Sequence, residues 1–345
     1  MGFTALELCA GGGGQALGLE LAGFCHAAVV EYEKAYCETL KTNRPNWHVI
    51  HSDICKFDAT PYKGVDLVAA GVPCPPFSVA GKQLGKFDDR DMFPAALKII
   101  ENANPRGVLI ENVPGLGNAK FADYRRSLFQ QLEDLGYQPQ STVLQASDFG
   151  VPQLRPRFVI VALRADDARY FTWPKVSQKT PTVGEVLRDL MGERGWKGLD
   201  QWVEIANTIA PTLVGGSKKH GGPDLGPTRA KAQWRQLSVD GMGVANEAPG
   251  EDFPQGGLPK LTLRMTARIQ SFPDSWIFPG GKTVSYRQIG NAFPPLVAKA
   301  LGKAIIKAFK LNDKAASAGA FDPSISESTR KSAPAGKRRS KILLT

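Results

Sequence analysis

The sequence predicts an α/β fold in which helices cover both faces of a mainly parallel sheet, joined to a smaller and less regular second domain. Over the first 165 residues, short apolar segments alternate with helical patterns, the order typical of such a sheet. From about residue 170 to residue 259, glycine, proline, lysine and tryptophan become frequent and neither periodicity persists. A loop of that length is rare inside a compact domain, so we expect this region to form a domain that binds rather than packs.

Seven segments are predicted as strands because each is short, apolar and bounded by turn-forming residues. They are residues 5–9, 25–30, 49–51, 65–70, 108–110, 142–144 and 158–163. Residues 15–22 and 121–135 are predicted as helices, and a glycine follows each at the position that favours a left-handed conformation. Regular patterns return over residues 261–272 and in a helix over residues 294–309, which we expect to pack on the sheet of the first domain.

Composition and charge indicate a globular protein with a polyanionic partner. The chain has 345 residues, of which 42% are hydrophobic and 22% charged. No apolar run approaches the roughly 18 to 20 residues that cross a bilayer, and the start lacks a secretory signal, so a cytoplasmic protein is expected. The net charge of +10 favours nucleic acid as a partner. About half of that charge lies after Asp313, in a segment rich in alanine, serine and lysine that we expect to be disordered.

The cysteines and histidines do not form a disulfide or metal pattern. The five cysteines all lie in the first 80 residues and show no C-x-x-C spacing, which favours reduced thiols. The four histidines have no ligand spacing either, so no metal site is expected.

A glycine-rich turn near the N-terminus predicts a nucleoside-containing cofactor. Four glycines follow the first predicted strand and precede a helix, so the backbone can approach a ligand closely. Glu31 ends the next strand, twenty residues after Gly11, the usual offset of a carboxylate that accepts from ribose hydroxyls. Asp53 and Tyr32 are suited to the adenine amine and the purine face. The spacing fits neither a Walker loop nor a strict dinucleotide fingerprint, which favours adenosine without a pyrophosphate.

Reactive residues recur at the ends of predicted strands. Pro73-Cys74-Pro75-Pro76 follows the apolar run 65–70, and a cysteine held rigidly there is positioned as a nucleophile. Glu111 follows residues 108–110, and Arg155 and Arg157 point the same way in an extended segment. Ligands bind outside the carboxyl ends of parallel strands, so these residues should converge. Each also has a simpler interpretation: a cysteine as a small hydrophobe, a surface carboxylate, and arginines that join domains or bind phosphates.

The order and the amino-acid sequences of these motifs resemble those of the DNA cytosine-C5 methyltransferases over about residues 3–165 and 260–310. The resemblance rests on the loop at residues 8–14, Pro73-Cys74 with Phe77-Ser78, Glu111-Asn112-Val113, Gln153 to Arg157, and residues 261–274 and 288–292. Two positions depart from the family pattern. Val72-Pro73-Cys74-Pro75 stands where Pro-Pro-Cys-Gln is frequent, and Cys9 where phenylalanine is frequent. Neither departure removes a reacting group.

The resemblance implies a Rossmann-like S-adenosylmethionine-dependent methyltransferase fold. It implies a discontinuous catalytic domain (residues 1–170 and 284–312), a target-recognition domain (residues 171–283) and a disordered basic tail (residues 313–345). The implied reaction moves a methyl group from S-adenosylmethionine to C5 of a cytosine within a specific duplex DNA sequence, after the base is flipped out, and leaves S-adenosylhomocysteine.

The resemblance also implies roles for individual residues. Cys74 would add to C6 of cytosine, Glu111 would share a proton with N3, Arg157 would bind O2, and Arg155 would fix the thiol and the carboxylate. The implied cofactor residues are Cys9, Ala10, Gly11, Gly12, Gly13, Gly14, Glu31, Tyr32, Asp53, Ile54, Pro73, Met92, Asn291 and Ala292. The implied DNA contacts are Ser78, Gln83, Lys218, Lys219, Arg229, Lys231 and Arg264.

We expect a monomer that acts on duplex DNA, with a restriction endonuclease as its genetic partner. Three alternatives remain: a transfer-RNA cytosine-C5 methyltransferase, a catalytically silent DNA-binding regulator, and, more distantly, a nicotinamide dehydrogenase. The glycine- and lysine-rich middle region argues against the first of these. The intact Cys74, Glu111, Arg155 and Arg157 argue against the second.

Overall fold

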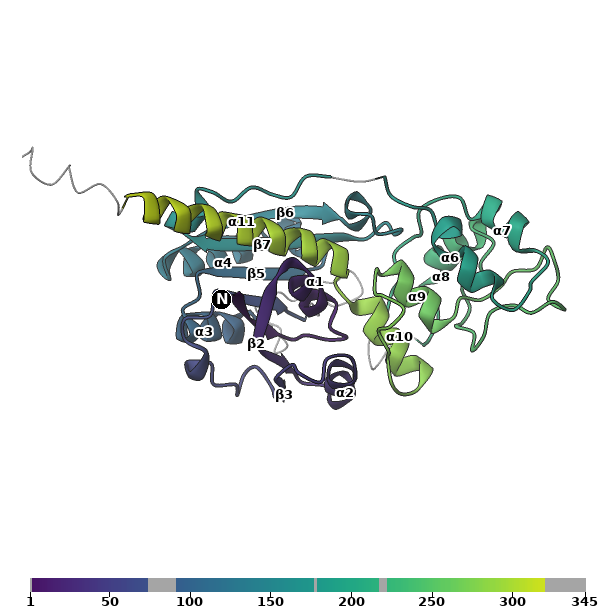
Figure 1. The fold of residues 1–345 in the computed structure, drawn as a ribbon, viewed down its shortest axis with the longest axis horizontal. Helices are drawn as coiled ribbons and strands as arrows, with labels where there is room; N and C mark the ends of the chain where they lie inside the picture. Colours follow the sequence, from purple (N-terminus) through teal and green to yellow (C-terminus); the bar gives the residue numbers. More distant parts are fainter. Residues whose placement is uncertain (1, 74–90, 177–178, 217–221, 320–345) are drawn as a thin grey trace, which may run out of the picture.

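A seven-stranded sheet forms the centre of the larger lobe (Figure 1). The computed structural model describes residues 2–73, 91–176, 179–216 and 222–319. The strand order is β3-β2-β1-β4-β5-β7-β6, and only β7 runs antiparallel to its neighbours. The strands are β1 (Phe3–Leu8), β2 (Phe24–Glu31), β3 (Val49–His51), β4 (Leu67–Gly71), β5 (Gly107–Asn112), β6 (Tyr137–Gln145) and β7 (Pro156–Arg164). The predicted α/β class and mainly parallel sheet are confirmed.

Helices cover both faces of this sheet. On one face, α1 and α11 pack on apolar side chains such as Ala5 and Leu109, and on the other α3 and α4 pack on side chains such as Leu6 and Ile110. The helices of this lobe are α1 (Gly14–Ala22), α2 (Lys34–Asn43), α3 (Phe93–Ala103), α4 (Ala122–Asp134), α5 (Ala165–Ala168) and α11 (Pro295–Gly319). Short 3₁₀ turns lie at η1 (Thr60–Tyr62), η3 (Pro114–Gly117), η4 (Ala119–Phe121) and η5 (Ala146–Phe149). Among the described residues, no helix combines the length and hydropathy needed to span a membrane.

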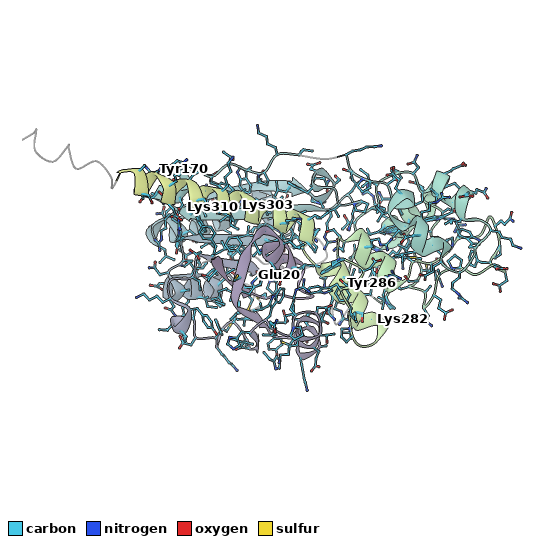
Figure 2. The ribbon with its side chains drawn as sticks, in the orientation of Figure 1. Glu20, Tyr170, Lys282, Tyr286, Lys303 and Lys310 are labelled. Atoms are coloured by element: carbon cyan, nitrogen blue, oxygen red, sulfur yellow. The ribbon has the colours of Figure 1, made fainter. Side chains whose placement is uncertain are left out.

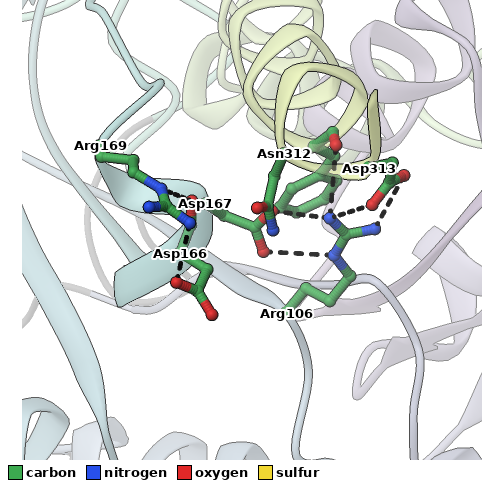
Figure 3. Close-up of polar contacts among 7 residues, drawn as sticks. Arg106, Asp166, Asp167, Arg169, Asn312 and Asp313 are labelled. Atoms are coloured by element: carbon green, nitrogen blue, oxygen red, sulfur yellow. Dashed lines mark hydrogen bonds and ion pairs between the residues drawn. The ribbon is translucent and has the colours of Figure 1, made fainter. Parts of the chain in front are cut away.

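The C-terminal helix returns to the sheet, as predicted, but it is longer than predicted. Arg106, just before β5, donates to Asp167 of α5 and to Asp313 of α11, and its guanidinium lies 4.4 Å from the Phe309 ring centroid (Figure 3). Helix α11 continues to Gly319, so the expectation of disorder from residue 313 is wrong for residues 313–319. Residues 320–345 lie outside the described part of the chain.

A second lobe lies beyond one end of the sheet (Figure 1). It contains α6 (Val183–Gly192), α7 (Leu199–Ile205), α8 (Thr228–Gln236) and α9 (Leu263–Ile269) around a hydrophobic core of its own that includes Trp202 and Trp234. The prediction of a smaller and less regular second domain is confirmed, but the expectation that this domain binds rather than packs missed its own hydrophobic core. Its helices are too short, and too often interrupted by glycine and proline, for a periodic pattern to emerge. Helix α10 (Lys282–Asn291) carries Tyr286, which is buried in the same core (Figure 2).

Candidate active site

Glu111 and Glu31 lie at the carboxyl edge of the parallel strands, as predicted from their places at strand ends. Gly71 at the end of β4 pairs with Glu111 on β5, and Glu31 at the end of β2 pairs with His51 on β3. Because all these strands run in one direction, their last residues reach the same edge of the sheet. The segment that leads to Cys74 therefore leaves the sheet directly beside Glu111.

A buried ion pair joins Glu111 to Arg157. The distance from Arg157 Nε to Glu111 Oε1 is 2.7 Å, and Glu111 is 9% exposed. Burial raises the pKa of the Glu111 carboxyl, whereas the charges of Arg157 and Arg155 act in the opposite direction without cancelling the rise. A carboxyl in this state is suited to share a proton with a ligand near neutral pH.

Asn112 fixes the backbone just before the expected nucleophile. Its side-chain amide nitrogen donates to the carbonyl oxygen of Val72 (3.3 Å), and its side-chain oxygen accepts from the backbone amide of Val113 (2.9 Å). Pro73 is the last described residue of this segment. Cys74, Ser78 and Gln83 lie outside the described residues, so the predictions for them stay predictions.

Arg155 lies between the two lobes. It is 1% exposed and donates to the carbonyl oxygens of Leu213 and Gly290, both at 2.7 Å. Its two short hydrogen bonds therefore go to backbone atoms of the second lobe and of the α10 terminus. A longer one, of 3.5 Å, goes to the side-chain oxygen of Gln153, and the charge of Arg155 still acts on Glu111. Arg155 thus lies at a junction between segments, and its predicted role toward the thiol stays a prediction because Cys74 lies outside the described residues.

The glycine loop is shaped partly by protein contacts and partly by open space. Gly11 has a φ of +57°, and a Cβ built on it would meet nothing within 4 Å. Cβ atoms on Gly12 and Gly13 would crowd Phe278 and Trp276, and one on Gly14 would overlap the carbonyl oxygen of Phe293. The open side of Gly11 is thus the place where the loop can approach a ligand. Cys9 adopts a φ of +53°, a rare conformation for a residue with a side chain.

Glu31 holds the loop in place beside this open side. Its two carboxylate oxygens accept from the amides of Gly11 and Glu33, each at 2.7 Å. Burial raises the pKa of the carboxyl, and the two backbone donors lower it in part. A carboxylate with unused lone pairs next to an open glycine fits the ribose of an adenosine cofactor.

The other predicted cofactor residues surround this point to different degrees. Ile54 and Ala292 are buried, Tyr32 is 63% exposed, and Asp53 accepts from the amide of Cys55 (2.9 Å). Met92 lies at the start of α3, with its sulfur 3.7 Å from the Cys55 sulfur. Asn291, predicted near the amino-acid end of the cofactor, is exposed and donates to the carbonyl oxygen of Gly216.

The predicted DNA contacts that the structure describes all lie in the second lobe. Arg229 is exposed on α8, and Lys231 pairs with Asp224 at 3.1 Å. Arg264 on α9 pairs with Asp274 at 2.8 Å and with Glu193 at 3.6 Å. Lys218 and Lys219 lie outside the described residues.

Two features of this region had not been predicted from the sequence. The buried amides of Gln153 and Gln270 share a hydrogen bond of 2.7 Å that ties the arginine segment to α9. Trp276 donates to the carbonyl oxygen of Gly12 at 3.2 Å. Gln153, Gln270 and Trp276 all lie in or next to the sequence motifs described above, but their contacts with their partners form only in the folded chain.

Comparisons with known proteins agree with this arrangement. The family described as C-5 cytosine-specific DNA methylase matches residues 3–307. The chain is 54% identical over 315 residues to the Type II methyltransferase M.NaeI of Lentzea aerocolonigenes, covering 90% of this chain and 76% of that protein. It is 50% identical over 313 residues to the Type II methyltransferase M.NgoMIV of Neisseria gonorrhoeae, covering 90% and 99%. The structure of the S. pombe Dnmt2 methyltransferase superimposes with a TM-score of 0.60 at 20% identity, covering 89% of this chain and 99% of that one, which shows a shared fold.

Proposed function

The chain belongs to the C-5 cytosine-specific DNA methylase family, and from this we propose that it methylates C5 of a cytosine in one duplex DNA sequence. The observation that supports the proposal most directly is the buried Glu111–Arg157 pair, beside the strand end that leads to Cys74. A carboxyl, a guanidinium and a cysteine at one edge are the groups that this chemistry needs.

The proposed donor is S-adenosylmethionine. When bound, it supplies an electrophilic methyl group. Glu31 would accept from its ribose hydroxyls and Asp53 from its adenine amine, while the open side of Gly11 gives the backbone access to it. The proposed cofactor residues further include Tyr32, Ile54, Pro73, Met92 and the loop itself.

In the proposed mechanism the thiolate of Cys74 forms a bond to C6 of the target cytosine. Electron density then moves toward N3, where the Glu111 carboxyl delivers its proton, and C5 becomes nucleophilic. Arg157 donates to O2 of the same base and stabilises the charge on the ring. Once C5 carries the methyl group, the C5 proton passes to water as the thiolate leaves C6, and the N3 proton returns to Glu111, which restores the aromatic ring.

The second lobe is the proposed reader of the DNA sequence. C5 and C6 are inaccessible in a stacked duplex, so the target base must be turned out, at a cost of a few kcal/mol. Phosphate contacts offset such a cost, and the proposed donors are Arg229, Lys231, Lys218 and Lys219. Lys231 would have to exchange Asp224 for phosphate, because the two already form an ion pair.

The names of the two relatives favour a role in a restriction–modification system. Both are called Type II methyltransferases, and one of them matches over nearly its whole length. The proposal therefore includes a restriction endonuclease with the same target, and a monomeric, cytoplasmic enzyme that acts on host DNA.

The direct test incubates the full chain with labelled S-adenosylmethionine and, side by side, duplex DNA or transfer RNA. Label in DNA only, with bisulfite sequencing that places the mark at C5 in one recurring sequence, is the expected result. The Cys74→Ser variant should transfer none. Label in RNA alone, or full transfer by the Cys74→Ser variant, would contradict the proposal.

A further inference from the structure

Trp276, in the segment between α9 and α10, packs against the glycine loop at the other end of the sequence. The indole Nε1 donates to the carbonyl oxygen of Gly12 at 3.2 Å, and the side chain is 4% exposed. A buried hydrogen bond to a main-chain carbonyl fixes the orientation of that peptide unit. Trp276 therefore contacts the loop directly.

The ring also determines which side of the loop is filled. A Cβ on Gly13 would lie 2.7 Å from Trp276 Cζ2 and 2.7 Å from Leu40 Cδ2. A Cβ on Gly12 would lie 3.1 Å from Phe278 Cε1. The aromatic residues thus occupy the protein side of Gly12 and Gly13, while the space around Gly11 stays open.

Trp276 is itself held firmly by α2. The Arg44 guanidinium lies 5.2 Å from the indole centroid and forms an ion pair with Glu20 at 2.8 Å. Asn43 makes two hydrogen bonds of 2.7 Å with the backbone of Ile277. An aromatic ring fixed from several sides can impose its position on a glycine loop, because glycines resist displacement little.

We propose that Trp276 is a positioning residue for the cofactor loop: it holds Gly12 and Gly13 so that the open side of Gly11 is ready for S-adenosylmethionine. This inference rests on the proposed function. A loop that is already held in the binding conformation loses little conformational entropy when the cofactor binds. Loss of Trp276 should therefore weaken the affinity for the cofactor. Reaction of the loaded enzyme should change little, because Trp276 is placed against the loop and touches no reacting group.

The test compares Trp276→Phe, Trp276→Leu and the matched control Trp202→Phe, which alters a buried tryptophan in the core of the second lobe. Isothermal titration with S-adenosylhomocysteine reports cofactor affinity without catalysis. Trp276→Phe loses the donated hydrogen bond and should bind about 3- to 10-fold more weakly. Trp276→Leu also loses the flat ring and should bind more weakly still, whereas Trp202→Phe should stay within about twofold of the parent.

A steady-state split distinguishes positioning from general damage. The KM for S-adenosylmethionine should rise in the Trp276 variants while kcat stays within about twofold of the parent. Parental affinity in both Trp276 variants, or a fall in kcat with unchanged KM, would overturn the inference. If the parent chain itself fails to bind S-adenosylhomocysteine, the proposed function fails instead, and the two failures are therefore distinguishable.

Discussion

Glu111 lies between two opposing influences that set its protonation. Burial favours the neutral carboxyl, and the guanidinium of Arg157, 2.7 Å away, favours the carboxylate. The net effect is a pKa above the usual value, which favours a carboxyl that can give a proton to a bound base. An exposed glutamate would hold no proton near neutral pH.

Replacing Glu111 by glutamine should remove the proton and keep the shape. We expect Glu111→Gln to lower the single-turnover rate of DNA methylation by about 10² to 10⁴, because an amide cannot deliver a proton to N3. Glu101→Gln, on the exposed side of α3, is the control and should keep the parental rate. A parental rate in Glu111→Gln would remove Glu111 from the mechanism.

Glu7 on β1 has a different kind of buried carboxyl. It is fully buried, and neither carboxylate oxygen has a hydrogen-bond partner among the described residues. Burial raises its pKa well above the usual value. As pH rises, the unfolded chain releases the Glu7 proton before the folded chain does. Between the two pKa values of Glu7, rising pH therefore lowers the free energy of unfolding.

The Glu7→Gln variant should lose this pH dependence. Relative to the parent, it should gain stability as pH rises above the usual pKa of a glutamate. Near pH 4 and below, where both states keep the proton, no such gain is expected. Urea unfolding across this pH range measures it. Parallel curves for the two proteins would show that Glu7 does not titrate in this way.

At the level of single residues, the positions predicted from the sequence agree with the structure where they depend on short-range sequence signals. The placement of Glu31 and Glu111 at strand ends was predictable, because strand, turn and helix signals are short-range. The partners of Arg155 were not, since Leu213 and Gly290 reach it only through the assembled fold. Nor could sequence show that a Cβ atom on three of the four loop glycines would meet protein atoms.

At the level of elements, the missed features share a cause. Strand β6 extends over Tyr137–Gln145, although only residues 142–144 were predicted, because it is an edge strand with many polar residues and one proline. Helix α11 extends past Asp313, whose contact with Arg106 forms only in the folded chain. The local sequence pattern predicts the buried central strands well. It predicts poorly the edge strand and the helix end, which make tertiary contacts.

The Arg106 cluster should contribute measurably to the docking of α11 (Figure 3). Asp167 is 3% exposed at its side chain, and Arg106→Leu would leave its charge with few donors. We expect a loss of about 2 to 4 kcal/mol in the free energy of unfolding.

The matched control for that experiment is Arg126→Leu. Arg126 pairs with Asp123 on the surface, where the side chains are 76% and 93% exposed. It should change stability by less than about 1 kcal/mol. Equal losses in the two variants, measured by urea unfolding, would show that the buried cluster contributes no more to the free energy of unfolding than a surface ion pair does.

At the level of the whole molecule, Arg155 lies at one of the contacts that connect the two lobes. Arg155 bridges the backbone of Leu213 and Gly290, and Gly290 lies so close to Gly215 that a Cβ on it would overlap the Gly215 backbone. Glycine is required on this side of the contact for steric reasons. The lobes are thus joined by backbone close packing as well as by side chains.

The Arg155→Lys variant should weaken this junction. A lysine keeps the charge but cannot reach both carbonyls with a planar fork, which leaves a buried acceptor without a donor. We expect the free energy of unfolding to fall by about 1 to 3 kcal/mol, together with slower DNA methylation. The affinity for S-adenosylhomocysteine should stay near the parental value, in contrast to the Trp276 variants. A selective loss of cofactor affinity would contradict this placement of Arg155.

The sequence predicted the class of fold and the presence of a second domain, because the alternation of strands and helices and its abrupt end are visible along the chain. It did not predict the packed core of the second lobe, which draws Trp202, Trp234 and Tyr286 from distant segments. The domain boundaries proposed at residues 171–283 place α10, which contributes to both lobes, at the limit between them.

The central claim is that the Cys74 thiolate bonds to C6 of a flipped cytosine in duplex DNA. A duplex with 5-fluorocytosine at the target tests it, because fluorine cannot leave C5 as a proton does and the covalent complex persists. In the presence of S-adenosylmethionine, we predict a denaturation-resistant protein–DNA complex whose peptide map places the linkage at Cys74, and none with Cys74→Ser. Methyl transfer to ordinary duplex DNA without any such complex, or a linkage at another residue, would contradict the account.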